Sequence, residues 1–400
     1  MFQAGFARID VTPPLGTPVA GYGYKRISDH VLDPIELNCV AFSDGENTGI
    51  LISADVLQVS ESLATKIRGM IAKRLNIPAD HVFLQALHQH TSIRVEIREP
   101  GAGPDPKYLD VLFRKYCDVA QSAVRDLQDA ELFVAEGQTP ERVAFIRRYK
   151  LKDGSFKTNP GRGKADIIDR PLGNADNTVR LLRFKREDGD IALINFHCHP
   201  DVIGGTGFSA DWPGFVRRYT EEALPGVKCI LVNGPQGDSN HINPFREKEE
   251  EEKRRGISYS SFMGKTVSDV ALSMWEQGKR MQTGKIWGKT QIVFSRTTPK
   301  SKDDLLFQQI STAFLGIGEV VFIGFGGEPF TKYAANVREK AKDLYVIAAC
   351  LANGAAGYLP TEEAFSQGGY EVNAGKFSPC LEKDLTDCAA QLLNEYKMQK

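Results

Sequence analysis

The chain lacks an excess of charge of either sign. Its 400 residues carry 50 lysines and arginines against 51 aspartates and glutamates, which gives a formal net charge of −1. Proteins that bind nucleic acid or an anionic membrane surface through electrostatics usually carry a basic excess or a basic patch. The near-neutral balance therefore predicts a small-molecule partner and no nucleic acid.

Long apolar runs are also missing. No segment approaches the roughly 20 apolar residues that a membrane-spanning helix needs, and the first residues, MFQAGFARIDVTPP, have neither the basic start nor the apolar core of a secretion signal. We therefore expect a cytoplasmic protein with no membrane span. These absences leave its oligomeric state open.

Cysteines are few and dispersed. The seven cysteines are odd in number and contain no CxxC pair, which argues against a disulfide framework and against a thiolate zinc site. We expect most of them to be buried free thiols. The remaining composition is that of an ordinary globular chain, and no Pro/Ser-rich linker divides it, so we expect a single domain over residues 1–400.

Apolar segments of strand length alternate with segments of helical periodicity. Residues 48–56 and 81–87 read as buried strands, and residues 61–78 between them show apolar side chains at helical spacing. A second such unit covers residues 319–352, with a helix beginning at Pro329. Strand–helix–strand units place their strands parallel. We predict an α/β fold with mixed, largely parallel sheets flanked by helices, and an active site at the carboxyl ends of the strands.

Four of the seven histidines occur in two copies of one pattern. The segment HQH places His88 and His90 after one apolar strand, and HCH places His197 and His199 after another. In an extended chain, side chains two residues apart point to the same face, so each pair brings two imidazoles within reach of a common centre. The spacing does not say which histidine of each pair is the ligand.

A carboxylate stands at the end of a third apolar strand, where Glu328 occupies the turn before the predicted helix. Imidazole nitrogen and carboxylate oxygen are ligands that zinc accepts, so the three strand ends favour a zinc site. Other catalytic patterns are weak. There is no GxSxG elbow, and Ser239 lies next to Asp238 and near His241, whereas the members of a catalytic triad are seldom neighbours in sequence.

Seven motifs resemble, in order, those of the neutral/alkaline ceramidases and their bacterial relatives. The resemblance spans nearly the whole chain and rests on GFARIDVTPPLGTPVAGYGYKR, HQHTS, NFHCHP, FSADWPGF, NGPQGD, GGEPF and GYLPTEEAFSQGGYE. Members of that superfamily are zinc amidases. The resemblance therefore implies a ceramidase-like zinc hydrolase that cleaves an amide (N-acyl) bond with a metal-activated water.

Matching these motifs position by position implies roles for individual residues. The implied zinc ligands are His88, His199, Glu328 and Tyr358. The implied substrate site beside the metal comprises the catalytic residues His90, Arg147 and Tyr370 and the substrate-binding residue Gly21. Arg148 is adjacent to Arg147, so the matched arginine could be displaced by one position. His90 would transfer a proton, and Arg147 and Tyr370 would stabilise an oxyanion.

Departures from the family pattern concern the substrate. The loops at residues 88–93 and 237–243 differ from the family motifs, and the chain ends soon after its tyrosine motifs without the C-terminal β-sandwich domain of true ceramidases. We therefore expect a smaller or non-ceramide N-acyl substrate. Two alternatives stay open: a zinc hydrolase of a lactone, an ester or an N-acetyl sugar, and a non-catalytic protein with a structural zinc site.

Overall fold

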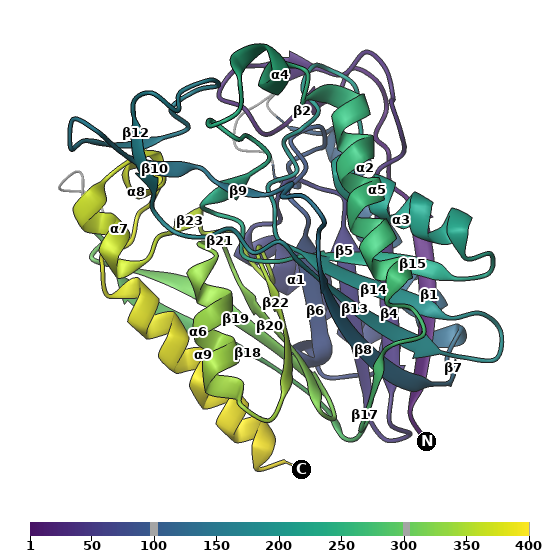
Figure 1. Cartoon of the computed structure of the whole chain (residues 1–400). Coiled ribbons are helices and arrows are strands. Elements are labelled where there is room, and N and C mark those ends of the chain that lie inside the picture. The colour runs from purple at the N-terminus through teal and green to yellow at the C-terminus, as the bar shows by residue number, and fades with distance from the viewer. Residues whose placement is uncertain (97–102, 299–304, 400) are drawn as a thin grey trace.

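The computed structural model describes residues 1–96, 103–298 and 305–399. Three large sheets lie at the centre, and helices cover their outer sides (Figure 1). All seven cysteines are free thiols, and all but Cys380 are buried, as predicted. No helix in the described part of the chain is long and apolar enough to cross a membrane.

The first sheet has the strand order β6-β5-β4-β1-β7. Its strands are β1 (Gln3–Asp10), β4 (Glu36–Ser43), β5 (Thr48–Ala54), β6 (Val82–Ala86) and β7 (Gln128–Asp129). The β5–β6 pair is parallel because α1 (Glu61–Leu75) carries the chain back between the two strands. Helix α2 (Pro106–Arg125) packs beside α1, and both contribute to the core on this side of the sheet.

The second sheet has the order β15-β14-β13-β8-β17. Its strands are β8 (Glu131–Gln138), β13 (Thr178–Lys185), β14 (Ile191–Phe196), β15 (Lys228–Asn233) and β17 (Lys279–Met281). The β14–β15 pair is parallel, with α3 (Asp211–Ala223) as its crossover. Helices α3 and α5 (Gly256–Ser273) pack on each other and against this sheet.

The third sheet has the order β18-β19-β20-β22. Its strands are β18 (Ile286–Arg296), β19 (Phe307–Ile317), β20 (Val320–Phe325) and β22 (Tyr345–Ala349). The β20–β22 pair is parallel and is joined by α6 (Lys332–Ala341). Helix α9 (Leu381–Lys397) lies beside α6 and along β18 (Figure 1).

Short elements build the loops around these sheets. They are β2 (Pro18–Val19), β3 (Arg26–Ile27), the 3-10 helix Ala79–His81, β9 (Phe145–Ile146), β10 (Arg148–Leu151), β11 (Phe156–Thr158), β12 (Ile168–Pro171), β16 (Ser239–Asn240), α4 (Lys248–Glu252), β21 (Glu328–Pro329), β23 (Tyr358–Leu359), α7 (Glu362–Gln367) and α8 (Tyr370–Ala374). The highly charged run of residues 246–256 contains α4.

The α/β class and the flanking helices agree with the prediction, but largely parallel sheets were a wrong expectation. Each large sheet has one parallel pair, and its other neighbouring strands are antiparallel. The apolar periodicity that finds strand–helix–strand units says nothing about the hairpin partners that lie next to them. The second unit's helix also begins at Lys332 and not at Pro329, because Glu328 and Pro329 pair with β23.

The inner faces of the three sheets share one aromatic core. The ring of Phe42 on β4 lies 5.3 Å from that of Phe184 on β13 and 6.1 Å from that of Phe322 on β20. All three side chains are completely buried. Strands covered both by helices and by other sheets need apolar side chains on both faces, which explains the nearly unbroken apolar runs in the sequence.

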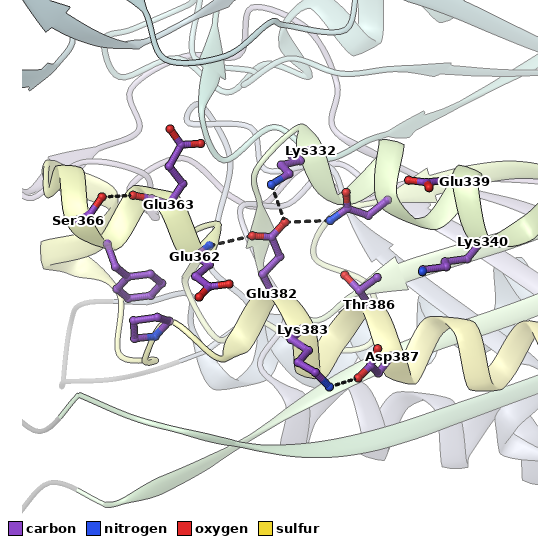
Figure 2. Close-up of a pocket in the computed structure, with 13 residues that line it drawn as sticks. Lys332, Glu339, Lys340, Glu362, Glu363, Ser366, Glu382, Lys383, Thr386 and Asp387 are labelled. Carbon is purple, nitrogen blue, oxygen red and sulfur yellow. Dashed lines mark hydrogen bonds and ion pairs between the residues drawn. The ribbon is translucent and has the colours of Figure 1, made fainter.

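A charged cleft of about 820 Å³ separates α6 and α7 from α9 (Figure 2). Its side chains largely pair with one another. Glu382 accepts a hydrogen bond from Asn336 at 2.9 Å and forms an ion pair with Lys332 at 3.2 Å. Lys383 forms an ion pair with Asp387. None of the candidate site residues lines it. We interpret it as a solvated groove between helices.

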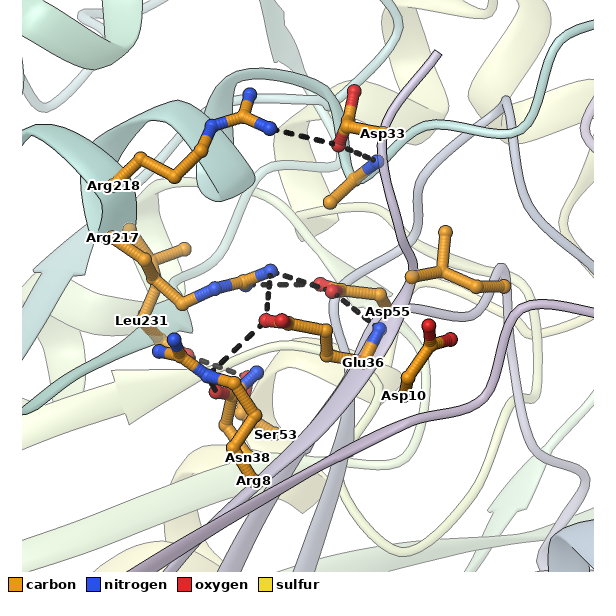
Figure 3. A network of polar contacts seen from close by, with 12 residues as sticks. Arg8, Asp10, Asp33, Glu36, Asn38, Ser53, Asp55, Arg217, Arg218 and Leu231 are labelled. Carbon is orange, nitrogen blue, oxygen red and sulfur yellow. Dashed lines mark hydrogen bonds and ion pairs between the residues drawn. The ribbon is translucent and has the colours of Figure 1, made fainter. Parts of the chain in front are cut away.

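A buried ion pair fastens the first sheet to the helix layer of the second (Figure 3). Asp55, directly after β5, accepts hydrogen bonds from both terminal nitrogens of Arg217 on α3, at 3.0 and 2.6 Å. The same carboxylate accepts the amide of Gln89 at 2.7 Å. Neither Asp55 nor Gln89 is exposed. The pair therefore also anchors the loop that carries His88 and His90.

We predict that Arg217→Met lowers the free energy of unfolding by about 3–5 kcal/mol, because it leaves the Asp55 carboxylate buried without its partner. Arg218→Met is the matched control, since the neighbouring arginine is 39% exposed and lies 3.6 Å from Asp33. The control should cost less than about 1 kcal/mol. Urea unfolding followed by tryptophan fluorescence measures both, and equal losses would contradict this role for the pair.

Candidate metal and catalytic site

Three strand ends deliver three predicted ligands to one point. His88 follows β6, His199 follows β14, and Glu328 lies in β21 after β20. One carboxylate oxygen of Glu328 (Oε2) is 3.2 Å from Nε2 of His88 and 3.2 Å from Nε2 of His199. All three side chains are buried. The structure therefore brings these residues together as the sequence predicted.

The opposite ring nitrogens of the two histidines are held by the backbone. Nδ1 of His88 is 2.8 Å from the carbonyl oxygen of Leu57, and Nδ1 of His199 is 2.9 Å from that of Gln236. A carbonyl oxygen only accepts, so Nδ1 carries the hydrogen and Nε2 of a neutral ring keeps the lone pair. Both lone pairs then face Glu328. This is how histidines that bind metals are usually oriented.

Three acceptors that face one another fit a cation. His199 Nε2 and Glu328 Oε2 have no hydrogen-bond partner among the described residues. Burial lowers the pKa of His88, but the Glu328 carboxylate outweighs this effect and the pKa is raised. Burial and then the charge of Arg147 lower the pKa of His199 to about 4. The Glu328 carboxylate therefore favours positive charge beside His88.

His90 completes a group of three imidazoles. The ligand atoms of His88, His90 and His199 all lie within 4.8 Å of one another, so these histidines could hold a metal ion. The ring of His90 differs from the other two, because neither of its nitrogens has a hydrogen-bond partner in the described structure. Burial and then the charges of His88 and His199 hold the pKa of His90 well below its usual value. His90 is therefore neutral at neutral pH.

The second histidine pair does not share a centre, so the sequence expectation fails for His197. Its Nδ1 is 3.9 Å from Asp176 and its Nε2 is 3.4 Å from the guanidinium of Arg338. Strand β14 ends at Phe196, and the alternation of side chains does not continue beyond it. In the first pair, His88 has a φ of 77°, which is also not strand geometry.

Tyr358 reaches the site through strand pairing. In the parallel β21–β23 bridge, Glu328 lies directly opposite Tyr358. The Tyr358 ring is 6.4 Å from the His199 ring, and the guanidinium of Arg147 lies 5.2 Å from the centre of the Tyr358 ring. Burial raises the pKa of the Tyr358 phenol, and the nearby Glu328 raises it further. The fourth predicted ligand thus stands beside the other three.

Arg147 and its neighbour Arg148 face different groups. Arg147 is buried. Its guanidinium donates hydrogen bonds to the Glu371 carboxylate and to the carbonyl of Gly237, each at 2.7 Å. Arg148 lies 5.1 Å from the centre of the Phe330 ring and donates to the carbonyl of Gly368 at 2.7 Å. Only Arg147 of the two is stacked on Tyr358 among the described contacts.

Tyr370 and Gly21 border the site. Tyr370 begins α8, is 59% exposed, and its ring lies 5.6 Å from that of Tyr358. Gly21 has a φ of 113°, and a Cβ atom there would lie 2.8 Å from Cγ and 2.9 Å from Cα of His90. Only glycine therefore fits against the back of His90 without displacing it.

Sequence reasoning missed two residues that contact His90. Oδ1 of Asp201 is 3.6 Å from Nδ1 of His90, and the Tyr22 hydroxyl donates to that same oxygen. The Tyr22 ring lies 5.2 Å from the His90 ring. A signal existed, since Asp201 follows His199 by two residues and Tyr22 follows Gly21. Neither residue belonged to a metal-ligand pattern, so neither was selected.

Taken together, the fold and the site define a mixed α/β protein with buried histidines that could hold a metal ion where strand ends meet. No protein-family model matches the chain, and a comparison with curated protein sequences finds no significant match. Solved structures do match. Neutral ceramidase from Pseudomonas aeruginosa has a TM-score of 0.79 and 13% sequence identity over 100% of this chain and 75% of that one.

A ceramidase complexed with C2 gives the same TM-score of 0.79 at 12% identity, again over 100% of this chain and 75% of that chain. The chain therefore has the neutral ceramidase fold.

We predict that Gly21→Ala displaces His90 and costs about 1–3 kcal/mol of stability, the usual cost of forcing extra atoms into a packed place. Gly23→Ala is the control, because a Cβ atom there meets nothing within 4 Å and Gly23 does not have a positive φ. Thermal unfolding measures the stability, and the imidazole signals of His90 in NMR spectra report its position. An undisturbed His90 signal in Gly21→Ala would contradict the close packing.

Proposed function

We propose that this protein is a zinc-dependent hydrolase that cleaves an N-acyl (amide) bond in a substrate other than ceramide. The observation that carries this proposal is a set of three buried acceptor atoms, in which His88 Nε2 and His199 Nε2 each lie 3.2 Å from Glu328 Oε2. The neutral ceramidase fold supports the same reaction class. The loops that differ from the family motifs favour a different substrate.

We assign the metal to His88, His199 and Glu328, with the Tyr358 hydroxyl as a fourth ligand. Two imidazoles favour zinc over calcium or magnesium, which prefer oxygen ligands. When bound, zinc lowers the pKa of a water ligand to about 7 and polarises a carbonyl group. The protein holds the imidazoles in the required tautomer through the carbonyls of Leu57 and Gln236.

His90 is assigned to proton transfer. It is a neutral, buried imidazole beside the proposed ligands, and neither ring nitrogen has a fixed partner among the described residues. Asp201, itself hydrogen-bonded to Tyr22, lies on the Nδ1 side of the ring. This arrangement would leave Nε2 of His90 to exchange a proton with the leaving amine, which needs one to depart.

Arg147 and Tyr370 are assigned to the charge that develops on the carbonyl oxygen. Burial acts to lower the pKa of Arg147, but Tyr358 and Glu371 outweigh it and raise the pKa, so this guanidinium stays positive. Tyr370 adds a phenol at the exposed border of the site. Fixed positive charge and hydrogen-bond donors stabilise a tetrahedral oxyanion.

Two other functions use the same residues differently. Hydrolysis of a lactone, an ester or an N-acetyl sugar would need every group named above, so only substrates distinguish it from an amidase. A structural zinc site would need a closed shell of four ligands and no further polar group. The buried and unpaired His90 argues against that second alternative.

We predict that purified protein carries tightly bound zinc, and that His199→Ala weakens zinc binding by more than about 100-fold. Loss of an outer-shell partner costs roughly 10- to 100-fold, and loss of a ligand should exceed that. His197→Gln is the matched control from the same HCH segment, because His197 faces Asp176 and Arg338. Elemental analysis and competition with a chelator measure both variants. Equal zinc loss in the two would contradict the ligand assignment.

We predict that His90→Ala lowers kcat by about 10²- to 10⁴-fold with zinc content unchanged, the usual scale for a general acid or base. A screen of N-acyl amino acids, N-acyl lipids, N-acetyl sugars and lactones supplies the assay substrate. The control is His30→Ala, whose imidazole is about half exposed and pairs with Asp29 at 2.6 Å. If His90→Ala loses zinc while His88→Ala keeps it, the roles of these two histidines are exchanged.

A further inference from the structure

A carboxylate lies beside the ring of His90. Oδ1 of Asp201 is 3.6 Å from Nδ1 of His90, and the Tyr22 hydroxyl donates a hydrogen bond to the same oxygen. The side chain of His90 is 11% exposed and that of Asp201 is 30% exposed. A carboxylate oxygen can accept two hydrogen bonds. Oδ1 of Asp201 therefore has room for a second donor, and Nδ1 of His90 lies beside it.

The backbones of His90 and Asp201 are joined as well. The His90 amide donates to the carbonyl of Pro200, the residue before Asp201, at 3.0 Å. The buried guanidinium of Arg26 donates to the carbonyl of His90 at 2.7 Å and to that of Gly205, farther along the loop of Asp201, at 2.8 Å. Because these bonds tie the two loops together before and after Asp201, its carboxylate stays next to the imidazole.

The loop that carries Asp201 is also anchored in the interior. The carboxylate of Asp211 is completely buried and accepts the amides of Val202 and Ile203 at 2.9 and 3.1 Å. Ser260 on α5 donates to the same carboxylate at 2.7 Å. Asp201 therefore projects from a backbone that buried hydrogen bonds hold in place.

Tyr22 is itself held against its neighbours. Its ring lies 5.2 Å from that of His90, and the guanidinium of Arg26 lies 4.3 Å from the centre of the Tyr22 ring. Gly21, the residue before Tyr22, packs so closely that a Cβ atom there would lie 2.8 Å from Cγ of His90. These contacts limit how far the His90 ring can turn away from Asp201.

The position of Asp201 distinguishes the two tautomers of a neutral imidazole. Such a ring has one nitrogen that donates and one that accepts. A lone pair on Nδ1 of His90 would meet a carboxylate oxygen, which only accepts, whereas a hydrogen on Nδ1 would point to it. The separation of 3.6 Å is longer than a hydrogen bond, but the hydrogen bonds of catalytic groups often shorten when the substrate binds. A hydrogen on Nδ1 and a lone pair on Nε2 are therefore the favoured arrangement.

We propose that Asp201, fixed by Tyr22, is a positioning residue that holds His90 in the tautomer with its hydrogen on Nδ1. The proposal rests on the hydrolase function above and assigns a step to that tautomer. Nε2 takes one proton from the attacking water and gives it to the nitrogen of the leaving amine as the C–N bond breaks. The hydrogen on Nδ1 stays on the ring throughout, and Asp201 gains no proton. With the hydrogen on Nε2, the ring would have no lone pair there to take the first proton.

The first test reads the tautomer and needs no substrate. In zinc-loaded protein labelled with ¹⁵N, the chemical shifts of the ring nitrogens show which one carries the hydrogen, and His90→Ala identifies the His90 signals. Native protein should carry it on Nδ1. Asp201→Asn should move it to Nε2, because the amide NH₂ can donate to Nδ1 and so favours a lone pair there. Asp169→Asn is the control, since that side chain is 44% exposed and pairs with Arg170.

The second test measures the turnover of a substrate found by the screen above. Asp201→Asn should lower kcat by about 10²- to 10⁴-fold, the scale of a general acid-base group, with KM and zinc content little changed. The double variant of His90→Ala with Asp201→Asn should be no slower than His90→Ala alone, because the effects of residues that act as a unit are not additive. A residue that only supported the fold would slow both backgrounds.

Tyr22→Phe removes one hydroxyl and tests the support of Asp201. Its kcat should fall by about 10-fold, the lower end of the scale for one hydrogen bond to a charged group. Tyr24→Phe is the matched control, because the Tyr24 ring stacks on that of Tyr22 at 5.5 Å but Tyr24 is 66% exposed. Should Asp201→Asn not fold, as circular dichroism would show, Tyr22→Phe should still give a mixture of the two His90 tautomers.

Three results would overturn the role of Asp201. They are a hydrogen on Nε2 of His90 in the native protein, a tautomer that Asp201→Asn or, in its place, Tyr22→Phe leaves unchanged, and a further loss of kcat when Asp201→Asn is added to His90→Ala. If the tautomer changes as expected but no compound of the screen is cleaved, the positioning role stands and the hydrolase function fails.

Discussion

Two backbone carbonyls determine the chemistry of the candidate site. The oxygens of Leu57 and Gln236 accept hydrogen bonds from Nδ1 of His88 and His199, which turns both Nε2 lone pairs toward the Glu328 carboxylate. Three acceptors that meet in a buried place fit a cation, because unpaired buried polar atoms are costly. The rest of the fold has to hold these carbonyls and side chains in position.

The buried pair of Asp55 and Arg217 contributes directly to this support. It joins the end of β5 to α3, and through Gln89 it fixes the segment between His88 and His90. Aromatic packing between the three sheets then sets how their strand ends meet. Because the proposed ligands come from three different sheets or their extensions, a shift of one sheet would separate them. Rigid packing of sheets is therefore what makes the site possible.

The sequence shows where strands end, which side chains can bind a metal and which motifs resemble the family. From these features we predicted that His88, His199 and Glu328 lie close together, and they do. The failures have physical causes. His197 does not face the site, because side chains alternate regularly only inside a strand and β14 ends at Phe196. Asp201 was not predicted, because a carboxylate that orients a histidine has no fixed spacing from it in the sequence. The number of parallel strand pairs was overestimated, because the apolar periodicity of a strand does not show whether its neighbour in the sheet is an antiparallel hairpin partner. The single domain, the cytoplasmic location and the roles of individual residues stay predictions.

Two buried arginines near the site are neutralised by carboxylates of the chain. Arg147 is paired with Glu371 and Arg217 with Asp55, so both serve the architecture as well as the local electrostatics. Removing either carboxylate would leave a buried guanidinium without its partner, which is strongly destabilising. The ion pairs that hold the loops of the site are therefore also part of what keeps the sheets together.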